Sequence, residues 1–424
     1  MEAVPTVVQK YGGSSLATIE QVRQVARAVA QTYRSGRPTV VVVSARGHTT
    51  NDLLALAELV DPTGNAREAD QLLATGEVES AALLAMTLIG FGVPAVSLTG
   101  AQAGVQVSGN HRSGLIERVQ TERITGLLEQ GNVVVVAGFQ GTTGEGELLT
   151  LGRGGSDTTA VALAAELSAA SCEIYTDVHG ICTADPRVEP DAKVLSTVDA
   201  EVMAEMAFAG ARVLHSRAVE LAAMHGVDLL VSRSGTPHPG TIILNGSEEM
   251  LETSDVVVAV THDLDVARVL VQSAETAGHD PVPDVLAELV HYSVPVDLIT
   301  RSGPHEVEFR MGFTIKCSHL HDIVEPLQRL AASFAGTVQI DDQVGKVSLI
   351  GTGLLNRPEN MARMLSVLTD AEIPTSWVST SQVRISAVVP RARTVEAVQL
   401  LHREFGLGTD GTSARLNPSA GKER

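Results

Sequence analysis

Short runs of apolar residues alternate with segments of helical periodicity through the first 250 residues of the chain. The apolar runs predict buried strands at Thr6–Lys10, Thr39–Val43, Ala95–Leu98, Val133–Ala137, Cys172–Val178 and Val227–Ser232. Between the first two runs, Val22, Val25, Ala26, Val29 and Tyr33 lie on one face of a predicted helix that begins near Thr18. Strands that alternate with helices are typical of an α/β fold with a parallel sheet. Residues 61–79 are rich in proline, glycine and acids, so we expect a connection that enters a helix at Gly76.

A weak internal repeat occupies the rest of the chain. Ala267–Val271 parallels Gly345–Leu349, Val294–Ile299 parallels Ile373–Val378, and Val324–Leu330 parallels Val395–Leu401. Each unit reads β-α-β-β-α-β, the order of a ferredoxin-like module. We therefore expect a large α/β domain over residues 1–250, followed by two small α+β modules at 256–340 and 341–415 that are separate or interleaved.

Composition and charge limit the classes of protein that remain. With 424 residues, 44% of them hydrophobic, and a mean hydropathy of +0.14, the chain can bury two or three cores. A net charge of −19 argues against a nucleic-acid or anionic-membrane surface, so local cations and backbone amides must hold any anionic ligand. No apolar run reaches transmembrane length. The three scattered cysteines and a start without a signal-peptide pattern indicate a cytoplasmic protein.

The strongest candidate for chemistry is the stretch Leu148–Arg187. Gly152, Gly154 and Gly155 flank Arg153, and Ser156 then opens an Ala-rich helical run. Backbone N–H groups gather at a helix N-terminus, so the pattern predicts an anion site that contains a guanidinium; an ordinary strand-to-helix turn stays open as the alternative. The strand that follows delivers Asp177 and then Asp185–Arg187 to the sheet edge where ligands of α/β sheets bind.

Two further charged residues suit a polar ligand. Lys10 ends the first strand beside Gly12 and Gly13, where it is either a phosphate clamp or a solvated lysine. The pattern of a Walker loop is missing. Glu77 at a helix start suits a cationic group, whereas Glu79 is expected to be a solvated first-turn acid.

Three motifs in fixed order closely resemble the aspartate kinase family. They are KYGGSS at Lys10–Ser15, GRGGSDTT at Gly152–Thr159, and YTDxxGxxxADPR at Tyr175–Arg187, followed by the repeated modules. The resemblance implies an amino-acid-kinase fold, a three-layer sandwich with a largely parallel central sheet, and two ACT-type regulatory modules. It also implies ATP-dependent formation of 4-phospho-L-aspartate, with Mg²⁺ held mainly through the nucleotide phosphates. The alternatives are a kinase for another amino acid or acidic metabolite, and a catalytically silent regulatory subunit or sensor, which the absence of Lys10, Arg153 or Asp157 would favour.

The resemblance also implies roles for individual residues. Lys10 and the amides of Gly12 and Gly13 would stabilise the transferring phosphoryl group, and Asp157 would orient Lys10 or the substrate ammonium. Glu77 would bind that ammonium and Arg153 the α-carboxylate. No protein base is required, because the attacking carboxylate is already ionised. The implied catalytic residues are Lys10, Arg153 and Asp157; the substrate-binding residues are Ser44, Thr50, Glu77, Arg153 and Ser156; the ATP-binding residues are Lys10, Tyr11, Gly12, Gly13, Ser14, Thr176, Asp177, Cys182, Asp185, Arg187 and Arg212; no metal ligand is implied.

Departures from the family pattern fall at the nucleotide and in the modules. Cys182 stands where the family commonly has tyrosine, and Arg212 replaces a common lysine, so the adenine end is expected to bind differently. In relatives, ACT loops close over lysine or threonine, whereas here Ser273–Pro283 and Thr300–Gly303 depart from the usual effector segments. Arg301 would also repel a cationic ligand. We therefore expect weak or absent inhibition by lysine and threonine, with the modules retained to hold a homo-oligomer together.

Overall fold

The chain forms two compact units in a computed structural model that describes residues 5–62, 64–235, 239–245, 256–273, 280–292, 294–302 and 309–408. The first unit comprises Met1–Cys182 and Val194–Ser254, and the second comprises Thr183–Lys193 and Asp255–Arg424. Residues 183–193 thus leave the first unit and pack in the second, which the predicted boundary at residue 250 did not anticipate. Ala184 is buried in the core of the second unit and Val188 packs against that core.

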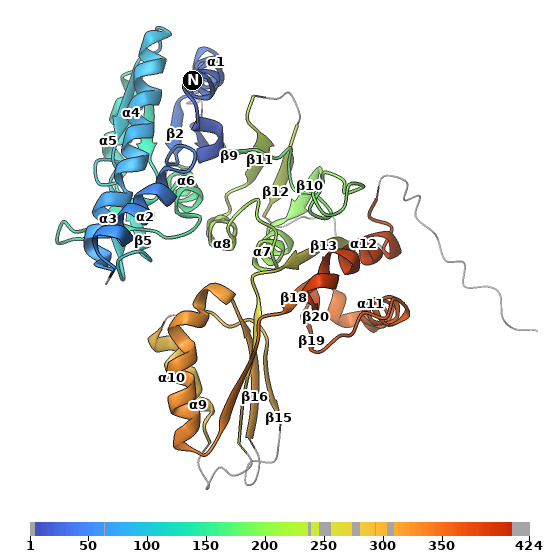
Figure 1. The fold of residues 1–424 in the computed structure, drawn as a ribbon. Coiled ribbons are helices and arrows are strands. Elements are labelled where there is room, and N and C mark those ends of the chain that lie inside the picture. The colour runs from blue at the N-terminus through green and yellow to red at the C-terminus, as the bar shows by residue number, and fades with distance from the viewer. Residues whose placement is uncertain are drawn as a thin grey trace, which may run out of the picture. The chain divides into compact units, whose positions relative to one another are not determined.

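An eight-stranded sheet forms the centre of the first unit (Figure 1). Its strands in spatial order are β10 (Thr197–Asp199), β12 (Thr241–Leu244), β11 (Leu229–Arg233), β9 (Ser171–Thr176), β1 (Val7–Tyr11), β2 (Thr39–Val43), β6 (Val133–Ala137) and β3 (Ala95–Leu98). Neighbouring strands are parallel throughout, except that β11 and β12 are antiparallel. The six predicted strands are confirmed with shifts of one or two residues, and β10 and β12 are additions at one edge.

Helices cover both faces of this sheet. Val41 and Val43 belong to the core that α1 (Ile19–Arg34) and α4 (Thr75–Gly90) cover. Val40 and Val42, on the opposite face, are also fully buried, and α6 (Gly155–Glu166) packs against β1 and β2. The expected three-layer arrangement is therefore confirmed. The first-unit elements that complete it are η1 (Gly13–Leu16), α2 (Thr49–Val60), α5 (Glu122–Glu129), α7 (Ala200–Phe208) and α8 (Ser216–His225).

The expected helix entry at Gly76 is confirmed within one residue, because α4 begins at Thr75, but the connection before it is not free of secondary structure. The segment contains a helix, α3 (Ala66–Leu73), capped by the Asn65 side chain, which accepts a hydrogen bond from the N–H of Glu68. Only Asp70 and Leu73 of α3 are buried, so the inward face is half polar and shows no apolar period. α3 packs against β8 of a second sheet that was not predicted, with strand order β5 (Leu115–Val119), β4 (Val105–Ser108), β7 (Gln140–Thr142) and β8 (Leu148–Thr150).

Contrary to the expectation from the sequence, one stretch in the described residues, Ala66–Gly90, is long and apolar enough to span a membrane, and half of its most apolar 18-residue window is buried in the fold. Within it, Ala81, Leu84 and Leu88 of α4 belong to the core of the first unit. The burial of this face assigns α4 to the interior of a folded domain.

The second unit contains two four-stranded antiparallel sheets, each with two helices. The first module consists of β14 (Ala267–Ser273), α9 (Val282–His291), β15 (Ile299–Ser302), β16 (Phe309–Ile315), α10 (Leu320–Ser333) and β17 (Thr337–Asp341). The second consists of β18 (Val344–Gly351), α11 (Pro358–Asp370), β19 (Val378–Thr380), β20 (Arg384–Pro390), α12 (Thr394–Glu404) and, from before the first module, β13 (Val257–Asp263). The shorter 3₁₀ segments are η2 (Cys317–His319), η3 (Leu354–Asn356) and η4 (Arg391–Arg393).

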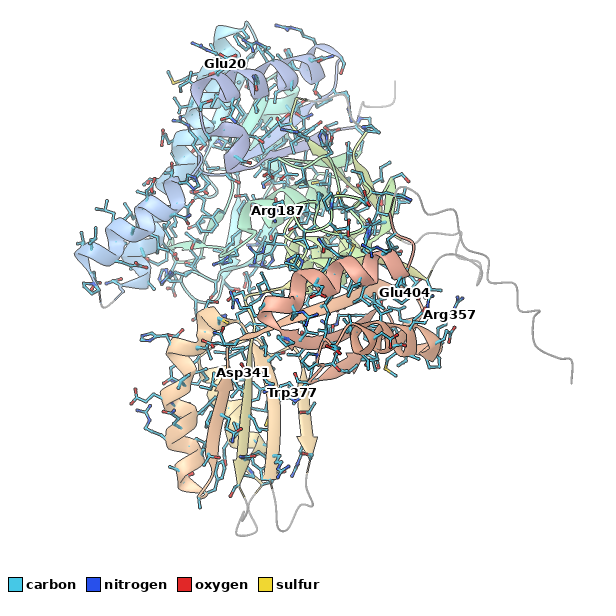
Figure 2. The ribbon with its side chains drawn as sticks, turned by 45° about the vertical axis from the view of Figure 1, so that its right-hand side comes forward. Glu20, Arg187, Asp341, Arg357, Trp377 and Glu404 are labelled. Atoms are coloured by element: carbon cyan, nitrogen blue, oxygen red, sulfur yellow. The ribbon has the colours of Figure 1, made fainter. Side chains whose placement is uncertain are left out.

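The two modules are interleaved, because β13 pairs with β18 and fills the place of the fourth strand of the second module. This agrees with the interleaved alternative, in which β13, at the start of the 256–340 segment, belongs to the second module. The sequence left the choice open because an alternating strand pattern does not reveal its partner. Polar contacts also join the modules. Asp297 forms ion pairs with Lys346 and Arg384. The guanidinium of Arg268, which forms an ion pair with Asp341 of the same module at 3.1 Å, lies 5.4 Å from the ring centroid of Trp377 in the second module. Asp341 and Trp377 are labelled in Figure 2.

Candidate active site

The carboxyl ends of four parallel strands meet at one edge of the central sheet. Short backbone hydrogen bonds tie the residues that follow them: Gly12 N–H donates to Tyr175 O at 3.2 Å, Ser44 N–H to Tyr11 O at 3.1 Å, and Gly138 N–H to Val43 O at 3.0 Å. This edge is where open α/β sheets bind ligands. The motifs at Lys10–Ser15 and Tyr175–Arg187 therefore start side by side at this edge.

Lys10 and Asp157 form an ion pair at this edge. Lys10 Nζ lies 2.6 Å from an Asp157 carboxylate oxygen, and the two side chains are only 11% and 12% exposed. Lys10 lies in β1 and Asp157 in the first turn of α6, so the pair crosses from the sheet to the helix. Of the two partners considered for Asp157, the structure shows Lys10. A lysine fixed in this way keeps its ammonium group in one place, as charge stabilisation requires.

Residues Gly152–Gly155, called the glycine loop below, present Arg153 at the start of α6. Gly152 and Gly154 have φ values of +74° and +71°, which side chains rarely tolerate. A Cβ at position 154 would also lie 2.2 Å from the Cβ of His215. Arg153 is exposed and forms no ion pair with any residue in the described part of the chain. It is therefore available to bind an external carboxylate.

Two residues of the first motif have contacts that the sequence did not reveal. The N–H of Gly12 donates to Tyr175 O at 3.2 Å. Tyr11 is 1% exposed and its ring stacks on that of Tyr175 with centroids 4.8 Å apart, so its side chain belongs to the core. A Cβ at Gly13 would lie 2.4 Å from Ala45 O, so this position requires glycine. The roles of Tyr11, Gly12 and Gly13 at the nucleotide stay predictions.

Glu77 lies in the first turn of α4 and is 3% exposed. One carboxylate oxygen, Oε1, accepts a hydrogen bond from the N–H of Ala45 at 3.0 Å. The other, Oε2, is buried and has no hydrogen-bond partner among the residues that the structure describes. Burial raises the pKa of Glu77 to about 7 from its ordinary value of 4.5, against the lowering effect of the bond from Ala45. A buried oxygen without a partner is costly, and a bound cation would remove that cost.

The remaining predicted substrate-binding residues are Ser44, Thr50 and Ser156. Ser44 follows β2, Thr50 is in the first turn of α2, and Ser156 is 8% exposed in the first turn of α6. Glu79 is not merely solvated as expected, because Arg46 lies 2.9 Å from its carboxylate. The Arg46 guanidinium also donates to the carbonyl oxygens of Leu16 and Ala17, and so ties η1 to α4.

The predicted nucleotide residues fall in both units. In the first unit, Thr176 Oγ1 donates to Asp177 at 3.0 Å, Cys182 is partly buried, and Ser14 and Arg212 are exposed. In the second unit, Arg187, labelled in Figure 2, lies 2.7 Å from Asp185, and its hydrogen bond lowers the pKa of that carboxyl group. The assignment of these residues to one nucleotide site stays a prediction.

Two residues near the glycine loop were not anticipated. His215 packs against Gly154, and burial lowers the pKa of its imidazole. Arg217 donates to Leu151 O at 2.9 Å and to Gly114 O at 2.8 Å. His215 directly precedes α8 and Arg217 lies in its first turn. No binding motif surrounds them in the sequence, so the sequence did not indicate that they lie near the glycine loop.

No group of three or more His, Cys, Asp or Glu side chains within the described residues could hold a metal ion.

The sequence and the fold match known proteins over almost their full length. The profile of the Amino acid kinase family matches residues 5–232, and that of the ACT domain matches residues 347–405. The aspartokinase of Thermus thermophilus is 41% identical over 410 residues, covering 95% of this chain and 98% of that protein. The aspartokinase of Mycolicibacterium smegmatis is 42% identical over 412 residues, covering 95% and 97%.

Solved structures of aspartate kinases also resemble this fold. The aspartate kinase of Synechocystis has a TM-score of 0.52 at 36% identity and covers 95% of this chain and 69% of that one. E. coli aspartokinase III, solved in complex with aspartate and ADP, has a TM-score of 0.77 at 24% identity and covers 94% and 99%. The fold and the charged sheet edge together define an amino acid kinase with ACT modules. Because the similarity to the curated relatives is so high and so complete, the chain belongs to the aspartokinase family.

Proposed function

We propose that this protein transfers the γ-phosphoryl group of ATP to the side-chain carboxylate of L-aspartate, which gives 4-phospho-L-aspartate and ADP. Its full-length relatives are aspartokinases, and E. coli aspartokinase III was solved with aspartate and ADP bound. Lys10, Arg153 and Asp157, whose loss would favour a silent regulatory subunit, are all present.

The observation that carries the proposal is the buried, partnerless Oε2 of Glu77. An amino acid supplies an ammonium group, which can donate to this oxygen. Its α-carboxylate can bind the guanidinium of Arg153 in a bidentate pair. Glu77 and Arg153 together suit a zwitterion, and the side-chain carboxylate is then left free to attack.

Lys10 supplies the charge that the reaction needs at the transferring group. A carboxylate must approach a tetra-anionic nucleotide, so catalysis depends on alignment and on charge neutralisation. Asp157 holds the Lys10 ammonium in place, and the N-terminus of α6 adds the partial positive charge of a helix end. The attacking carboxylate is ionised at neutral pH, so no side chain has to remove a proton.

In the first unit, the nucleotide is assigned to Gly13, Ser14, Thr176, Asp177, Cys182 and Arg212; the same role for Asp185 and Arg187 of the second unit stays an expectation from the resemblance. The exposed guanidinium of Arg212 suits a phosphate or a ribose edge, and Thr176 and Asp177 follow β9 at the ligand edge of the sheet. When bound, Mg²⁺ would neutralise charge on the nucleotide phosphates, and its ligands would be the phosphate oxygens and water.

A screen of acceptors for ATP-dependent ADP release tests the substrate. We expect turnover with L-aspartate and little with L-glutamate, D-aspartate or succinate, since succinate lacks the ammonium that Glu77 would bind. Turnover with another acid and none with L-aspartate would favour the specialised-kinase alternative.

We further propose that the ACT modules hold a homo-oligomer together and respond weakly or not at all to lysine and threonine. β15 is the edge strand of its sheet and is exposed along its whole length, with Ile299 at 49% exposure, so a strand of a second copy can approach it. Arg301 of β15 lies 2.9 Å from Asp280, so its charge is offset and the expected repulsion is weaker than the sequence suggested. A cationic effector would instead have to displace Arg301 from Asp280. Residues 274–279 and 303 of the altered segments lie outside the described residues.

Sedimentation measures the oligomeric state, and calorimetry with rate assays measures the response to lysine and threonine. We expect an oligomer that Ile299→Lys shifts towards monomer, because a lysine on an edge strand opposes strand pairing. Lysine and threonine, alone or together, should leave the rate nearly unchanged at millimolar concentration. Strong concerted inhibition by lysine and threonine would contradict the proposed weak response to effectors. An oligomer that is insensitive to Ile299→Lys would contradict the proposed role of β15 in self-association.

A further inference from the structure

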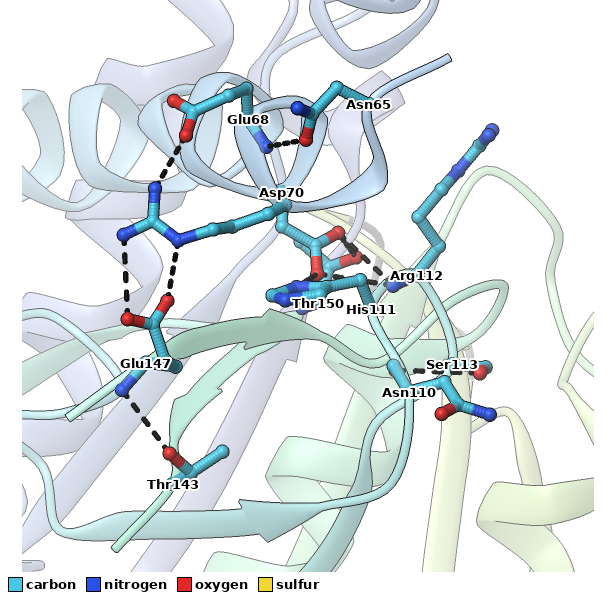
Figure 3. Close-up of polar contacts among 11 residues, drawn as sticks. Asn65, Glu68, Asp70, Asn110, His111, Arg112, Ser113, Thr143, Glu147 and Thr150 are labelled. Carbon is cyan, nitrogen blue, oxygen red and sulfur yellow. Dashed lines mark hydrogen bonds and ion pairs between the residues drawn. The ribbon is translucent and has the colours of Figure 1, made fainter. Parts of the chain in front are cut away.

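A completely buried carboxylate, Asp70 of α3, binds the strand that leads into the glycine loop (Figure 3). Asp70 accepts hydrogen bonds from Thr150 through its hydroxyl at 2.6 Å and its N–H at 3.1 Å. It also accepts one from the N–H of Arg112 at 3.1 Å and lies 2.9 Å from Nδ1 of His111. A buried charge is costly unless it is saturated with hydrogen bonds, and this one is.

Arg217 of α8 binds the residue that directly follows this strand, Leu151. Its guanidinium donates to Leu151 O at 2.9 Å and to Gly114 O at 2.8 Å. It is about half buried, and burial lowers its pKa. Asp70 and Arg217 therefore bind the backbone of adjacent residues with opposite charges: Asp70 accepts from the N–H of Thr150, and Arg217 donates to the carbonyl oxygen of Leu151.

These contacts complete the backbone hydrogen bonding immediately before Arg153. Thr150 N–H donates to Asp70 and Thr150 O accepts from Gly114 N–H at 2.9 Å. Leu151 N–H donates to Phe139 O at 2.9 Å and Leu151 O accepts from Arg217. The glycine loop begins at the next residue, so Arg153 projects from a fixed base.

Backbone strain is concentrated at the same place. Arg112 and Phe139, with φ values of 67° and 70°, are two of the five non-glycine residues in the described ranges that have positive φ. Arg112 donates to Asp70, and its carbonyl oxygen would lie 2.9 Å from a Cβ at position 152. Strained conformations persist only where the surrounding contacts determine them, and they gather at functional sites.

Asp70 also connects the two substrate anchors. α3 ends at Leu73, and α4, which carries Glu77 in its first turn, begins two residues later. Gln140 holds the junction by donating to Ala74 O at 2.9 Å. One end of the Asp70 network thus lies on the helix pair that presents Glu77, and the other on the strand that presents Arg153.

We infer that Asp70, with Arg217, is a positioning residue for the amino-acid substrate, because it fixes the place of Arg153 relative to Glu77. This inference rests on the proposed function, in which those two residues bind the α-carboxylate and the ammonium. Asp70 touches neither substrate nor nucleotide; it acts through the loop. Its loss should therefore weaken aspartate binding more than it slows the chemical step or weakens ATP binding.

Asp70→Asn is the first variant, since it keeps the shape of the side chain and removes the charge. We expect the KM for aspartate to rise about tenfold or more, as for other lost charged hydrogen bonds, with kcat and the KM for ATP within about twofold. Thr150→Val is a milder variant that removes only the hydroxyl donor, and it should shift the aspartate KM in the same direction. It keeps the inference testable if Asp70→Asn does not fold.

Glu173→Gln is the matched control. Glu173 is another buried carboxylate of the first unit, at 7% exposure, and it accepts hydrogen bonds from Gln9 and Tyr175, neither of which belongs to the glycine loop. It should lower thermal stability in the same way as Asp70→Asn and leave the aspartate KM unchanged. Stability loss without a KM change in both variants would make Asp70 merely structural.

A double-mutant cycle with Arg153→Ala shows whether Asp70 acts through Arg153. Residues that act through one another are non-additive, so Asp70→Asn should add less than about twofold to the aspartate KM once Arg153 is absent. Independent, multiplicative effects would overturn the inference. If the wild-type enzyme shows no aspartate-dependent turnover, the proposed function is rejected. If the wild type turns over aspartate normally and the aspartate KM is unchanged in both Asp70→Asn and Thr150→Val, only the positioning role is rejected.

Discussion

Replacing Lys10 with methionine should lower kcat at least about 10²- to 10³-fold, the usual effect of removing one group that stabilises transition-state charge. Lys10 is buried beside Asp157, so no mobile cation from solvent can take its place at full strength. Methionine keeps most of the length of the side chain and removes the charge. Steady-state kinetics at saturating aspartate and ATP measure the effect directly.

The same substitution leaves Asp157 as a buried charge without its cation, which by itself destabilises a fold by about 3–5 kcal/mol. The double variant Lys10→Met/Asp157→Asn removes that cost. It should recover thermal stability and remain as slow as the single variant. A folded Lys10→Met enzyme with kcat within about tenfold of the wild type would show that Lys10 does not serve the transferring phosphoryl group.

Glu77→Gln and Arg153→Ala should each raise the KM for aspartate roughly 10- to 100-fold, because each removes one charged hydrogen-bonding partner of the substrate. The KM for ATP should change by about twofold or less, since neither residue is assigned to the nucleotide. Initial rates over both substrates separate the two constants. Equal weakening of ATP binding would contradict this division of roles.

The pH dependence of the aspartate KM identifies Glu77 more specifically. Its pKa is raised to about 7, and only the ionised form attracts an ammonium group. The aspartate KM should therefore fall about tenfold per pH unit as pH rises towards 7, and level off above it. Glu77→Gln should abolish this dependence. Glu79→Gln, two residues along α4, should retain it, because Glu79 pairs with Arg46 instead.

The ionisation of Glu77 also affects the stability of the substrate-free protein, but in the opposite direction: aspartate binding strengthens as pH rises, whereas this contribution to stability falls. An acid whose pKa is higher in the folded than in the unfolded state stabilises the fold while it is protonated. That contribution is complete below pH 4.5 and is lost as pH rises towards 7. Aspartate should therefore raise the melting temperature more at pH 8 than at pH 6, and this difference should disappear in Glu77→Gln.

The parallel sheet and its main helices could be predicted because their residues carry strong periodic signals. Thr39–Val43 is a run of apolar residues buried on both faces, and Thr18 and Gln21 form the capping box that starts α1 where the pattern placed it. The glycine loop was similarly visible, since Gly152 and Gly154 have backbone conformations that favour glycine. These features depend on residues close together in sequence.

The remaining features depend on partners distant in sequence. From its polar sequence neighbours, Asp70 would be expected on the surface. It is buried instead, because it binds Arg112 and Thr150, which lie 42 and 80 residues away in the sequence. β13 looks like the first strand of one module but completes the sheet of the other. The N–H of Gly12 in the first motif donates to Tyr175 O of β9, a pairing that the sequence does not reveal. No local pattern identifies such partners, because they are set by the packing of the whole fold.

Trapping the acyl phosphate with hydroxylamine tests the central claim most directly. With ATP, Mg²⁺ and L-aspartate, the protein should produce aspartate β-hydroxamate in an amount equal to the ADP released, and omission of any one component should abolish it. Hydroxamate at the side-chain carbon shows that the side-chain carboxylate received the phosphoryl group. ADP release without hydroxamate, or no reaction with L-aspartate at all, would contradict the proposal that this protein is an aspartate kinase.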